Sequence, residues 1–240
     1  MSSLKGKVAL VTGGSRGIGL AIARALVADG VNVAVTGLSG AHLSAARKPI
    51  EAAGPGSVET LQADVRKHDE VVRAVHATVA RFGGLDILIN NAGIGIFKPV
   101  ADMDPADWAT VIDTNLTGVF NACHAAIPHM RARGGGFIIN ISSLASRNAF
   151  PNAAAYCATK AGLNQFSEAL MQEVRYDGIR VSYVLPGSVA TGFNNRSESD
   201  GADWKTSADD VAGVVLSLLH SDPRSIPSRV EIRPARPPRK

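Results

Sequence analysis

The sequence predicts an α/β protein built on a doubly wound parallel sheet of about seven strands, with helices on both faces. Two observations predict this fold class. Short β-rich runs alternate with helical patterns along the chain, and such alternation requires right-handed crossovers between parallel strands. Most of the strand candidates are also continuous apolar runs, which is typical of strands that are buried on both faces.

The strand candidates are short and rich in β-branched residues. They are Val8–Thr12, Asn32–Thr36, Val58–Gln62, Leu85–Asn90, Phe137–Ser142, Arg180–Leu185 and Arg229–Ile232. Their number gives the estimate of seven strands.

The helical candidates lie between these strands and carry apolar residues at helical spacing. They are Arg16–Asp29, Ala41–Ala53, Asp69–Phe82, Asp104–Arg131, Tyr156–Tyr176 and Ala208–His220. Gly30 and Gly54 follow the first two at positions where glycine commonly ends a helix. Pro49 lies inside the second helix, which we expect to kink or split there.

The composition favours one globular domain. The chain has 240 residues, of which 45% are hydrophobic and 19% charged, enough to build a full core. We expect a single domain over residues 1–233 and a basic, Pro-rich tail, PARPPRK, over residues 234–240. No apolar run approaches the roughly 20 residues that span a bilayer, the start lacks a signal peptide's apolar region, and only two cysteines are present. We therefore expect a cytoplasmic protein with no membrane partner and no disulfide framework.

The sequence pI near 9.3 raises the question of nucleic-acid binding. However, the segment from Arg224 to Lys240 contains six basic residues and one acid, which gives it a charge of +5 within a total of +4. The first 223 residues therefore sum to −1. Because the excess charge belongs to the C-terminal segment, we expect no nucleic-acid partner.

The stretch VTGGSRGIG, Val11 to Gly19, joins the first strand to the first helix. Gly13 would permit the tight turn, Gly17 the approach of a pyrophosphate to the backbone, and Gly19 close packing of the helix on the sheet. The phosphates would then lie at the positive end of the helix. A glycine cluster can also be a simple turn, but its place after an apolar strand favours phosphate binding.

Polar residues follow two further strands. Asn90 and Asn91, in LINNAGIG, end the fourth strand, where a parallel sheet places ligands, although Asn and Gly also simply form turns. Tyr156 and Lys160, in YCATK, are four residues apart and share a helix face. A nearby ammonium would lower the pKa of the phenol and suit it to acid–base chemistry, but Tyr and Lys at this spacing are also common on solvated helices.

Together these motifs resemble the short-chain dehydrogenase/reductase family. TGGSRGIG, NNAG, Asn115 in TNLTG, Ser143 in NISS, YCATK and PGSVAT occur in the family's order and spacing, between about Gly6 and Thr191. The resemblance implies a single-domain Rossmann fold and an oxidoreductase that uses NAD or NADP, with no metal. The ending SRVEIRPARPPRK differs from the glycine-rich ending of many relatives and resembles the branch that contains hydroxy-acid and serine dehydrogenases.

The resemblance also implies catalytic roles by position. Tyr156 is the general acid or base at the carbonyl oxygen, and Lys160 lowers its pKa and bonds the nicotinamide ribose. Ser143 orients the carbonyl and stabilises developing negative charge. Asn115 holds a water that links Lys160 to solvent, although it could instead be a surface residue or a local kink in a helix.

The cofactor and substrate contacts follow from the same resemblance. Asp64 would meet the adenine edge, Asn91 the adenosine-side ribose, and Thr191 the nicotinamide carboxamide. The full set of cofactor contacts is Gly13, Ser15, Arg16, Gly17, Ile18, Gly19, Leu38, Ser39, Asp64, Val65, Asn91, Ala92, Gly93, Tyr156, Lys160, Pro186, Gly187, Val189 and Thr191. The substrate contacts are Ser143, Ala145, Phe150, Tyr156 and Phe193. Phe97 and Trp204 could join Phe150 and Phe193 as the wall of an apolar pocket, or all four could be core residues. The polar stretch between Thr191 and Ala208 could close over the ligand.

The end of the second strand, NVAVTGLSG, predicts the cofactor. NAD-preferring relatives usually have an Asp at the position of Gly37, where it holds the ribose diol. With Gly37 at this position, the contact with the diol is absent, and so is the carboxylate that would repel a 2′-phosphate. Leu38 stands where many NADP-preferring relatives have Arg, so Arg16 is the available cation. We therefore expect NADP, with NAD possible.

The resulting hypothesis is an oxidoreductase that transfers hydride between NADP(H) and a carbonyl or secondary alcohol of a small organic substrate. The substrate would be of the 3-oxoacyl, ketone, aldehyde or 3-hydroxy acid type. The alternative is a scaffold or redox sensor that binds a dinucleotide and has lost turnover. The family resemblance also implies a homotetramer or dimer, formed partly by the Asp104–Arg131 and Tyr156–Tyr176 helices.

Overall fold

The computed structural model describes residues 3–193, 199 and 201–237. Seven parallel strands form one sheet in the order β3-β2-β1-β4-β5-β6-β7. The strands are β1 (Val8–Val11), β2 (Asn32–Gly37), β3 (Val58–Gln62), β4 (Ile87–Asn90), β5 (Gly136–Ile141), β6 (Ile179–Pro186) and β7 (Arg229–Ile232). The predicted doubly wound Rossmann-type sheet is confirmed, and the strand ends agree with expectation to within two residues.

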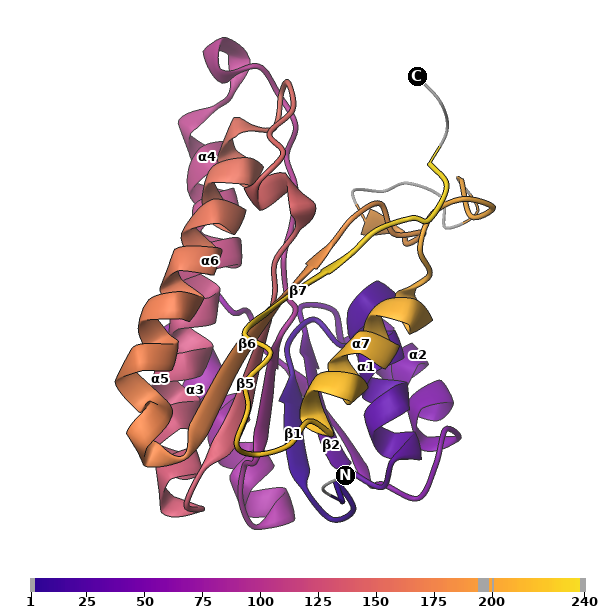
Figure 1. Cartoon of the computed structure of the whole chain (residues 1–240), viewed down its shortest axis with the longest axis vertical. Helices are drawn as coiled ribbons and strands as arrows, with labels where there is room; N and C mark the ends of the chain where they lie inside the picture. The colour runs from indigo at the N-terminus through magenta and orange to yellow at the C-terminus, as the bar shows by residue number, and fades with distance from the viewer. Residues whose placement is uncertain (1–2, 194–198, 200, 238–240) are drawn as a thin grey trace.

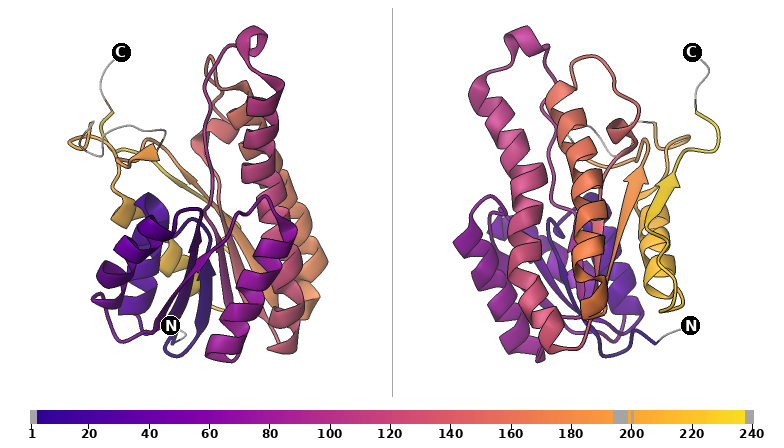
Figure 2. Two further views of the ribbon diagram at one scale, coloured as in Figure 1. Left: turned by 180° about the vertical axis from the view of Figure 1, so that it is seen from behind. Right: turned by 60° about the vertical axis from the view of Figure 1, so that its left-hand side comes forward.

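Helices cover both faces of the sheet (Figures 1 and 2). The α-helices are α1 (Gly17–Ala28), α2 (Gly40–Glu51), α3 (His68–Phe82), α4 (Pro105–Ile112), α5 (Gly118–Ala132), α6 (Ala154–Val174) and α7 (Ala208–Leu219). Shorter turns are η1 (Val100–Asp102), η2 (Asp113–Thr117), η3 (Leu144–Ser146) and η4 (Arg175–Asp177). Among the described residues, no helix combines the length and the apolar character that a membrane crossing requires.

The core has two halves, one on each face of the sheet. On one face, α1, α2 and α7 pack through side chains such as Ile22, Leu43 and Val215. On the other, α3, α5 and α6 pack through side chains such as Val75, Ala122 and Leu163. Because the central strands are apolar on both sides, burying both faces stabilises the sheet, at about 25 cal/mol for each Å² of apolar surface removed from water.

The strand order creates the place for a ligand. β1 pairs with β2 on one side and with β4 on the other, so the chain reverses its direction of winding between them. In an open α/β sheet, the crevice at the carboxyl ends of the strands beside such a switch is the usual ligand site. The glycine-rich turn after β1 and the Asn91 turn after β4 both emerge there.

Two local predictions about helix breakers are corrected. α2 does not split at Pro49 but continues to Glu51, because Pro49 lies in the last turn, where its missing N–H removes a single hydrogen bond. Gly30 has a left-handed backbone (φ 80°) just after α1, as expected. Gly54 does not, and its lack of a side chain instead lets the chain pass against Ala28, where a Cβ would overlap the backbone of α1.

The helix expected over Asp104–Arg131 is interrupted. α4 and α5 are joined by η2, a π-helical turn. In a π-helix the backbone hydrogen bonds join residues five apart, whereas in an α-helix they join residues four apart. Gly118 begins α5 at a close contact with Val65, where a Cβ would lie 2.7 Å from Cγ2. The π-turn places Asn115 in a fully buried position, which rules out the alternative of a surface residue.

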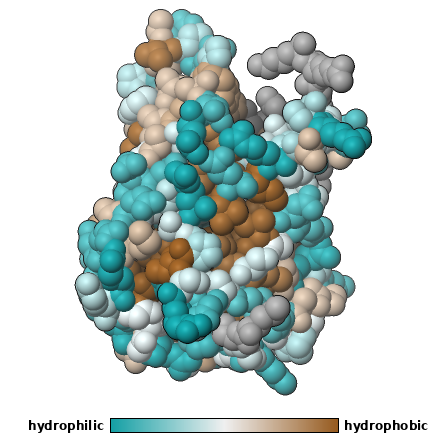
Figure 3. Space-filling view, viewed as in Figure 1, coloured by the Kyte–Doolittle hydropathy of each residue, from teal (hydrophilic) through white to brown (hydrophobic). Residues whose placement is uncertain are grey.

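The edge strand β7 leads into the C-terminal segment. Gly187 N donates to Ile232 O at 2.8 Å. Pro234 Cδ lies 3.2 Å from where a Cβ on Gly187 would be. Figure 3 shows an apolar area near the middle of this face of the molecule, bordered by hydrophilic side chains. The domain boundary at residue 233 stays a prediction, which deletion of residues 234–240 and a comparison of melting temperatures would test.

Candidate active site

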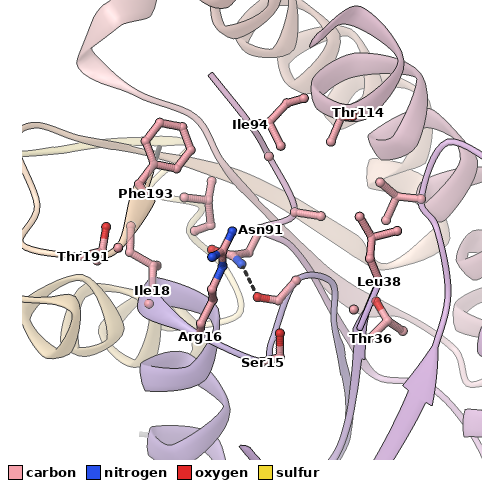
Figure 4. A pocket seen from close by; sticks show the side chains of 18 of the residues that line it. Ser15, Arg16, Ile18, Thr36, Leu38, Asn91, Ile94, Thr114, Thr191 and Phe193 are labelled. Atoms are coloured by element: carbon pink, nitrogen blue, oxygen red, sulfur yellow. Dashed lines mark hydrogen bonds between the residues drawn. The ribbon is translucent and has the colours of Figure 1, made fainter. Parts of the chain in front are cut away.

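A cavity of about 550 Å³ opens at the carboxyl ends of the strands. It is lined by the turn after β1, the end of β2, the segments after β3 and β4, the end of β5, the start of α6 and the loop after β6. Figure 4 shows Thr191 and Phe193 at one end of this pocket, Thr36 and Leu38 at the other, and Arg16 and Asn91 between them. The cavity is therefore elongated across the switch between β1 and β4.

Most of the predicted site residues line this cavity. They are Gly13, Ser15, Arg16, Gly17, Ile18, Leu38, Ser39, Asp64, Val65, Asn91, Ala92, Gly93, Ser143, Tyr156, Lys160, Pro186, Gly187, Val189, Thr191 and Phe193. Four others, Gly19, Asn115, Ala145 and Phe150, are not among the lining residues. Trp204 borders a separate hollow between α7 and the C-terminal segment, so it does not join the other aromatic residues.

The glycine-rich turn is shaped by close backbone contacts. Gly13 and Gly17 have left-handed backbones (φ 63° and 54°), which side-chain-bearing residues rarely adopt. A Cβ on Gly19 would overlap Gly13 O and the Asn91 amide. The N-terminus of α1 follows at once, and no side chain caps it, so its first N–H groups face the cavity without an intrahelical partner. Such a terminus suits an anion.

Thr12 and Asn91 hold this turn in place. Thr12 Oγ1 accepts hydrogen bonds from Asn91 N at 3.0 Å and Ala92 N at 3.1 Å. The Asn91 amide donates to Thr12 O and Gly13 O, both at 3.0 Å. Asn91 Nδ2 thus braces the β1 turn, and the expected contact of Asn91 with the adenosine-side ribose stays a prediction. Thr12 was missed, although a polar residue directly after an apolar strand is a signal for a brace of this kind.

The end of the cavity near β2 carries basic groups. His42 and Arg66 line it, and Arg16 lines the middle of the cavity (Figure 4). The Asp64 carboxylate is held by Arg66 in a salt bridge of 2.6 Å. The Arg66 guanidinium keeps the pKa of Asp64 below its usual range. Ser39 caps α2 by accepting from His42 N at 3.3 Å. His42 and Arg66 were missed, because neither lies in a motif and only the fold brings them to the cavity that Arg16 also lines.

Tyr156 and Lys160 project from the first two turns of α6, and Ser143 follows β5 at the start of η3. Lys160 Nζ lies 5.8 Å from the centre of the Tyr156 ring and donates to Ile141 O at 2.9 Å. Gly93 lies beside this group: a Cβ there would make an ordinary contact of 3.5 Å with Lys160 Nζ and a tighter one of 3.3 Å with Asn115 Oδ1.

Burial dominates the electrostatics of this pair. It raises the pKa of Tyr156, an effect that the hydrogen bond with Ser143 opposes. It lowers the pKa of Lys160 to about 8. Burial therefore outweighs the expected lowering of the Tyr156 pKa, because a low-dielectric site disfavours both charged forms, the phenolate and the ammonium.

Asn115 ties together the two sides of the cavity. Its Oδ1 accepts from Ile94 N at 2.8 Å, and its Nδ2 donates to Ile94 O at 2.9 Å and Thr159 Oγ1 at 3.1 Å. The side chain thus joins the segment after β4 to α6, close to Lys160. Its expected role in holding a water molecule stays a prediction.

Aromatic rings surround Tyr156. The ring of Phe97 lies 5.7 Å from that of Tyr156, and the ring of Phe193 lies 5.9 Å from it. Phe150 extends the cluster through Phe97, at 5.7 Å between ring centres. A Cβ on Gly95 would lie 2.7 Å from Phe97 Cζ, so this glycine allows the ring to reach the site. The loop expected to close over the ligand lies partly outside the described residues, at 194–198 and 200.

The buried Lys160 predicts how stability depends on pH. Its pKa is about 8 in the folded protein against an ordinary value of 10.5, so between these values the unfolded chain binds more protons. The free energy of unfolding should therefore rise with pH in this window and fall as pH drops through about 8. From pH 7.5 to 9.5 the native protein should gain on the order of 2 kcal/mol relative to Lys160→Met, as measured by urea unfolding. Parallel pH profiles would contradict the burial effect.

Comparisons with known proteins agree with this geometry. The family model for the short chain dehydrogenase matches residues 7–202. An uncharacterised oxidoreductase of Methylorubrum extorquens is 38% identical over 96% of this chain and 97% of its own length. A 3beta-hydroxysteroid dehydrogenase of Eggerthella lenta is 41% identical over 82% of this chain and 76% of its own.

Among solved structures, a metagenomic short-chain oxidoreductase in complex with NADP superposes with a TM-score of 0.85 at 38% identity, covering 98% of this chain and all of that one. The agreement thus extends from the sequence motifs to the whole fold. The chain belongs to the short-chain dehydrogenase/reductase family of NAD(P)-dependent oxidoreductases.

Proposed function

We propose that this protein transfers hydride between NADP(H) and the carbonyl or secondary alcohol of a small, largely apolar substrate. The observation that carries the proposal is the convergence of Ser143, Tyr156 and Lys160 on one cavity with the glycine-rich turn and the uncapped N-terminus of α1. The glycines allow a phosphate group to approach the backbone closely, and the helix terminus supplies N–H donors for it. These residues therefore fit a dinucleotide.

The chemistry assigned to the side chains follows from their atoms. When bound, the cofactor supplies the hydride for reduction or accepts it in the reverse direction. Tyr156, kept protonated by its buried surroundings, donates its hydroxyl proton to the carbonyl oxygen. Ser143 donates a hydrogen bond to the same oxygen and stabilises the negative charge that develops on it. Lys160 places a positive charge beside the phenol and favours the phenolate that proton donation leaves.

Replacing Tyr156 by Phe tests this assignment. The change removes the proton donor and keeps the ring contacts with Phe97 and Phe193, so turnover should fall about 10²–10⁴-fold. NADPH affinity, measured by fluorescence titration, should change little. Tyr176→Phe is the matched control, because Tyr176 is 92% exposed. Turnover that survives in Tyr156→Phe would remove Tyr156 from the mechanism, and a native protein inactive with every carbonyl tested would favour the alternative of a binding scaffold.

The proposed preference for NADP over NAD rests on the charged residues that line the cavity. Among the described lining residues, the acid there is Asp64, and Arg66 already pairs with it. Arg16 makes no ion pair with any described residue, so its guanidinium can meet a phosphate. Gly37 presents no carboxylate to a ribose diol. The NADP found in the solved relative gives this proposal independent support.

Arg16→Ala should weaken the preference for NADP. A charge-assisted hydrogen bond contributes about 1.5–3 kcal/mol, so the native ratio of kcat/KM for NADP(H) over NAD(H) should be about 10–150 and should drop towards unity in the variant. Arg24→Ala, on the exposed side of α1, is the matched control. Gly37→Asp should reverse the preference, because the new carboxylate would hold a ribose diol and repel a 2′-phosphate. The side chain can be accommodated, since its Cβ would lie 3.2 Å from Ser15 Oγ and needs only a small shift. A native preference for NAD would refute the proposal.

The aromatic cluster supports an apolar substrate. Phe97, Phe193 and Tyr156 present ring faces and edges next to the reacting hydroxyl, and such surfaces favour alkyl or aromatic groups over carboxylates. The relative from Eggerthella lenta is named a 3beta-hydroxysteroid dehydrogenase, which supports a substrate of this apolar kind. A panel of aryl and alkyl ketones against 3-oxo and 3-hydroxy acids, read by nicotinamide absorbance, would test this order.

Two expectations about the protein's setting are carried forward as proposals. Self-association is supported by exposed Trp108 on α4 and Phe120 on α5 and by the apolar area in Figure 3, because large exposed apolar areas commonly mark interfaces. Light scattering would distinguish a tetramer or dimer from a monomer. A reducing, cytoplasmic setting is supported by Cys123 and Cys157, which are both unpaired; fractionation of the cells that make the protein would test it.

A further inference from the structure

A directed chain of hydrogen bonds runs from α6 to the turn that carries Ser143. The Ser142 hydroxyl donates to Asn164 Oδ1 at 2.6 Å, and Asn164 Nδ2 donates to Ser146 Oγ at 2.8 Å. The Ser146 hydroxyl then donates to Ser143 O, also at 2.6 Å. Each group in the chain has a defined donor or acceptor role, so the orientation of the Asn164 amide follows from its neighbours.

The chain connects the two parts of the active site. Asn164 lies one turn beyond Lys160 on α6, the helix that also carries Tyr156. Ser143 lies on the other side, at the start of the turn η3, where its Oγ accepts from Ala145 N at 3.1 Å. Asn164 is 8% exposed and Ser142 is 4% exposed, so the bonds between them lie in a low-dielectric environment and are strengthened there.

We propose that Asn164, acting through Ser146, is a positioning residue that fixes the Ser143 hydroxyl relative to the Tyr156 hydroxyl. The inference rests on the proposed function, in which Tyr156 is the proton donor and Ser143 stabilises the oxyanion. The hydrogen-bonded chain through Asn164 would keep these two hydroxyls aligned. An oxyanion donor is effective only when its hydrogen lies where the charge develops. The turn η3 is only three residues long and packs against α6, so bonds from that helix decide its geometry.

The first arm of the test measures whether Asn164 acts through Ser143. Asn164→Ala and Ser146→Ala should each lower kcat for carbonyl reduction about tenfold, and the double variant should be no worse than either, because both break one chain. In a Ser143→Ala background, Asn164→Ala should cost less than about twofold. The affinity for NADPH should stay within about twofold throughout. Losses that multiply in the Ser143→Ala background would show a general structural role and overturn the proposal.

Ser167→Ala is the matched control. Ser167 is a buried hydroxyl on the same helix, and it accepts from Asn140 Nδ2 and donates to Leu163 O without contacting the Ser143 turn. Its loss removes a buried polar contact from α6 but leaves the chain through Asn164 intact. A fall in kcat equal to that of Asn164→Ala would mean that any buried contact on α6 has the same effect, which would also overturn the proposal.

The second arm needs no turnover. The protein has three tyrosines, so a ¹³Cζ-tyrosine NMR spectrum is simple, and Tyr156→Phe identifies the Tyr156 signal. Since Ser143 hydrogen-bonds Tyr156, the signal should move in Asn164→Ala in the same direction as in Ser143→Ala, and should stay in place in Ser167→Ala. An unmoved signal in Asn164→Ala overturns the inference. If the native protein reduces no carbonyl, the proposed function fails, and this spectrum alone decides whether Asn164 aligns the two hydroxyls.

Discussion

The parallel direction of all seven strands is the constraint on which the rest of this structure depends. It brings the carboxyl ends of the strands to one edge, and the opposite winding on the two sides of β1 opens a crevice there. Backbone segments approach one another closely at that edge. Gly13 and Gly19 are needed there because a single Cβ at each would overlap a neighbouring backbone atom. Thr12 and Asn91 then hold the bare turn rigid.

Burial at this edge sets the chemistry as well as the shape. Lys160 is buried and Tyr156 is half-buried, and this burial shifts the pKa of Tyr156 upward and that of Lys160 downward. A neutral phenol next to a readily deprotonated amine is a pair poised to exchange charge once a ligand changes the local field. Ser143 works against the burial effect at Tyr156, so the position of one hydroxyl matters more here than it would in solvent.

Much of the fold was predictable from the sequence because the evidence for it is local. Apolar runs mark strands such as β4 and β6, and helical spacing marks α3 and α7, whether or not their partners are known. The exceptions were features that depend on a neighbour in space. The π-turn at Asn115 exists because Ile94 and Thr159 take up its side chain, and Gly54 is needed because α1 passes beside it. Neither contact leaves a periodic mark in the chain.

The site divides in the same way. The sequence by itself determined the family, the glycine-rich turn and the set Ser143, Tyr156 and Lys160, because short motifs carry them and their chemistry depends on residue type and spacing. Only the tertiary structure decided which other groups surround them: Arg66 on Asp64, Phe97 against Tyr156, and Asn164 bridging to the Ser143 turn. Those contacts join residues from separate elements, and their energies depend on burial and distance. Both quantities exist only after the sheet has assembled and closed its two apolar faces against the helices.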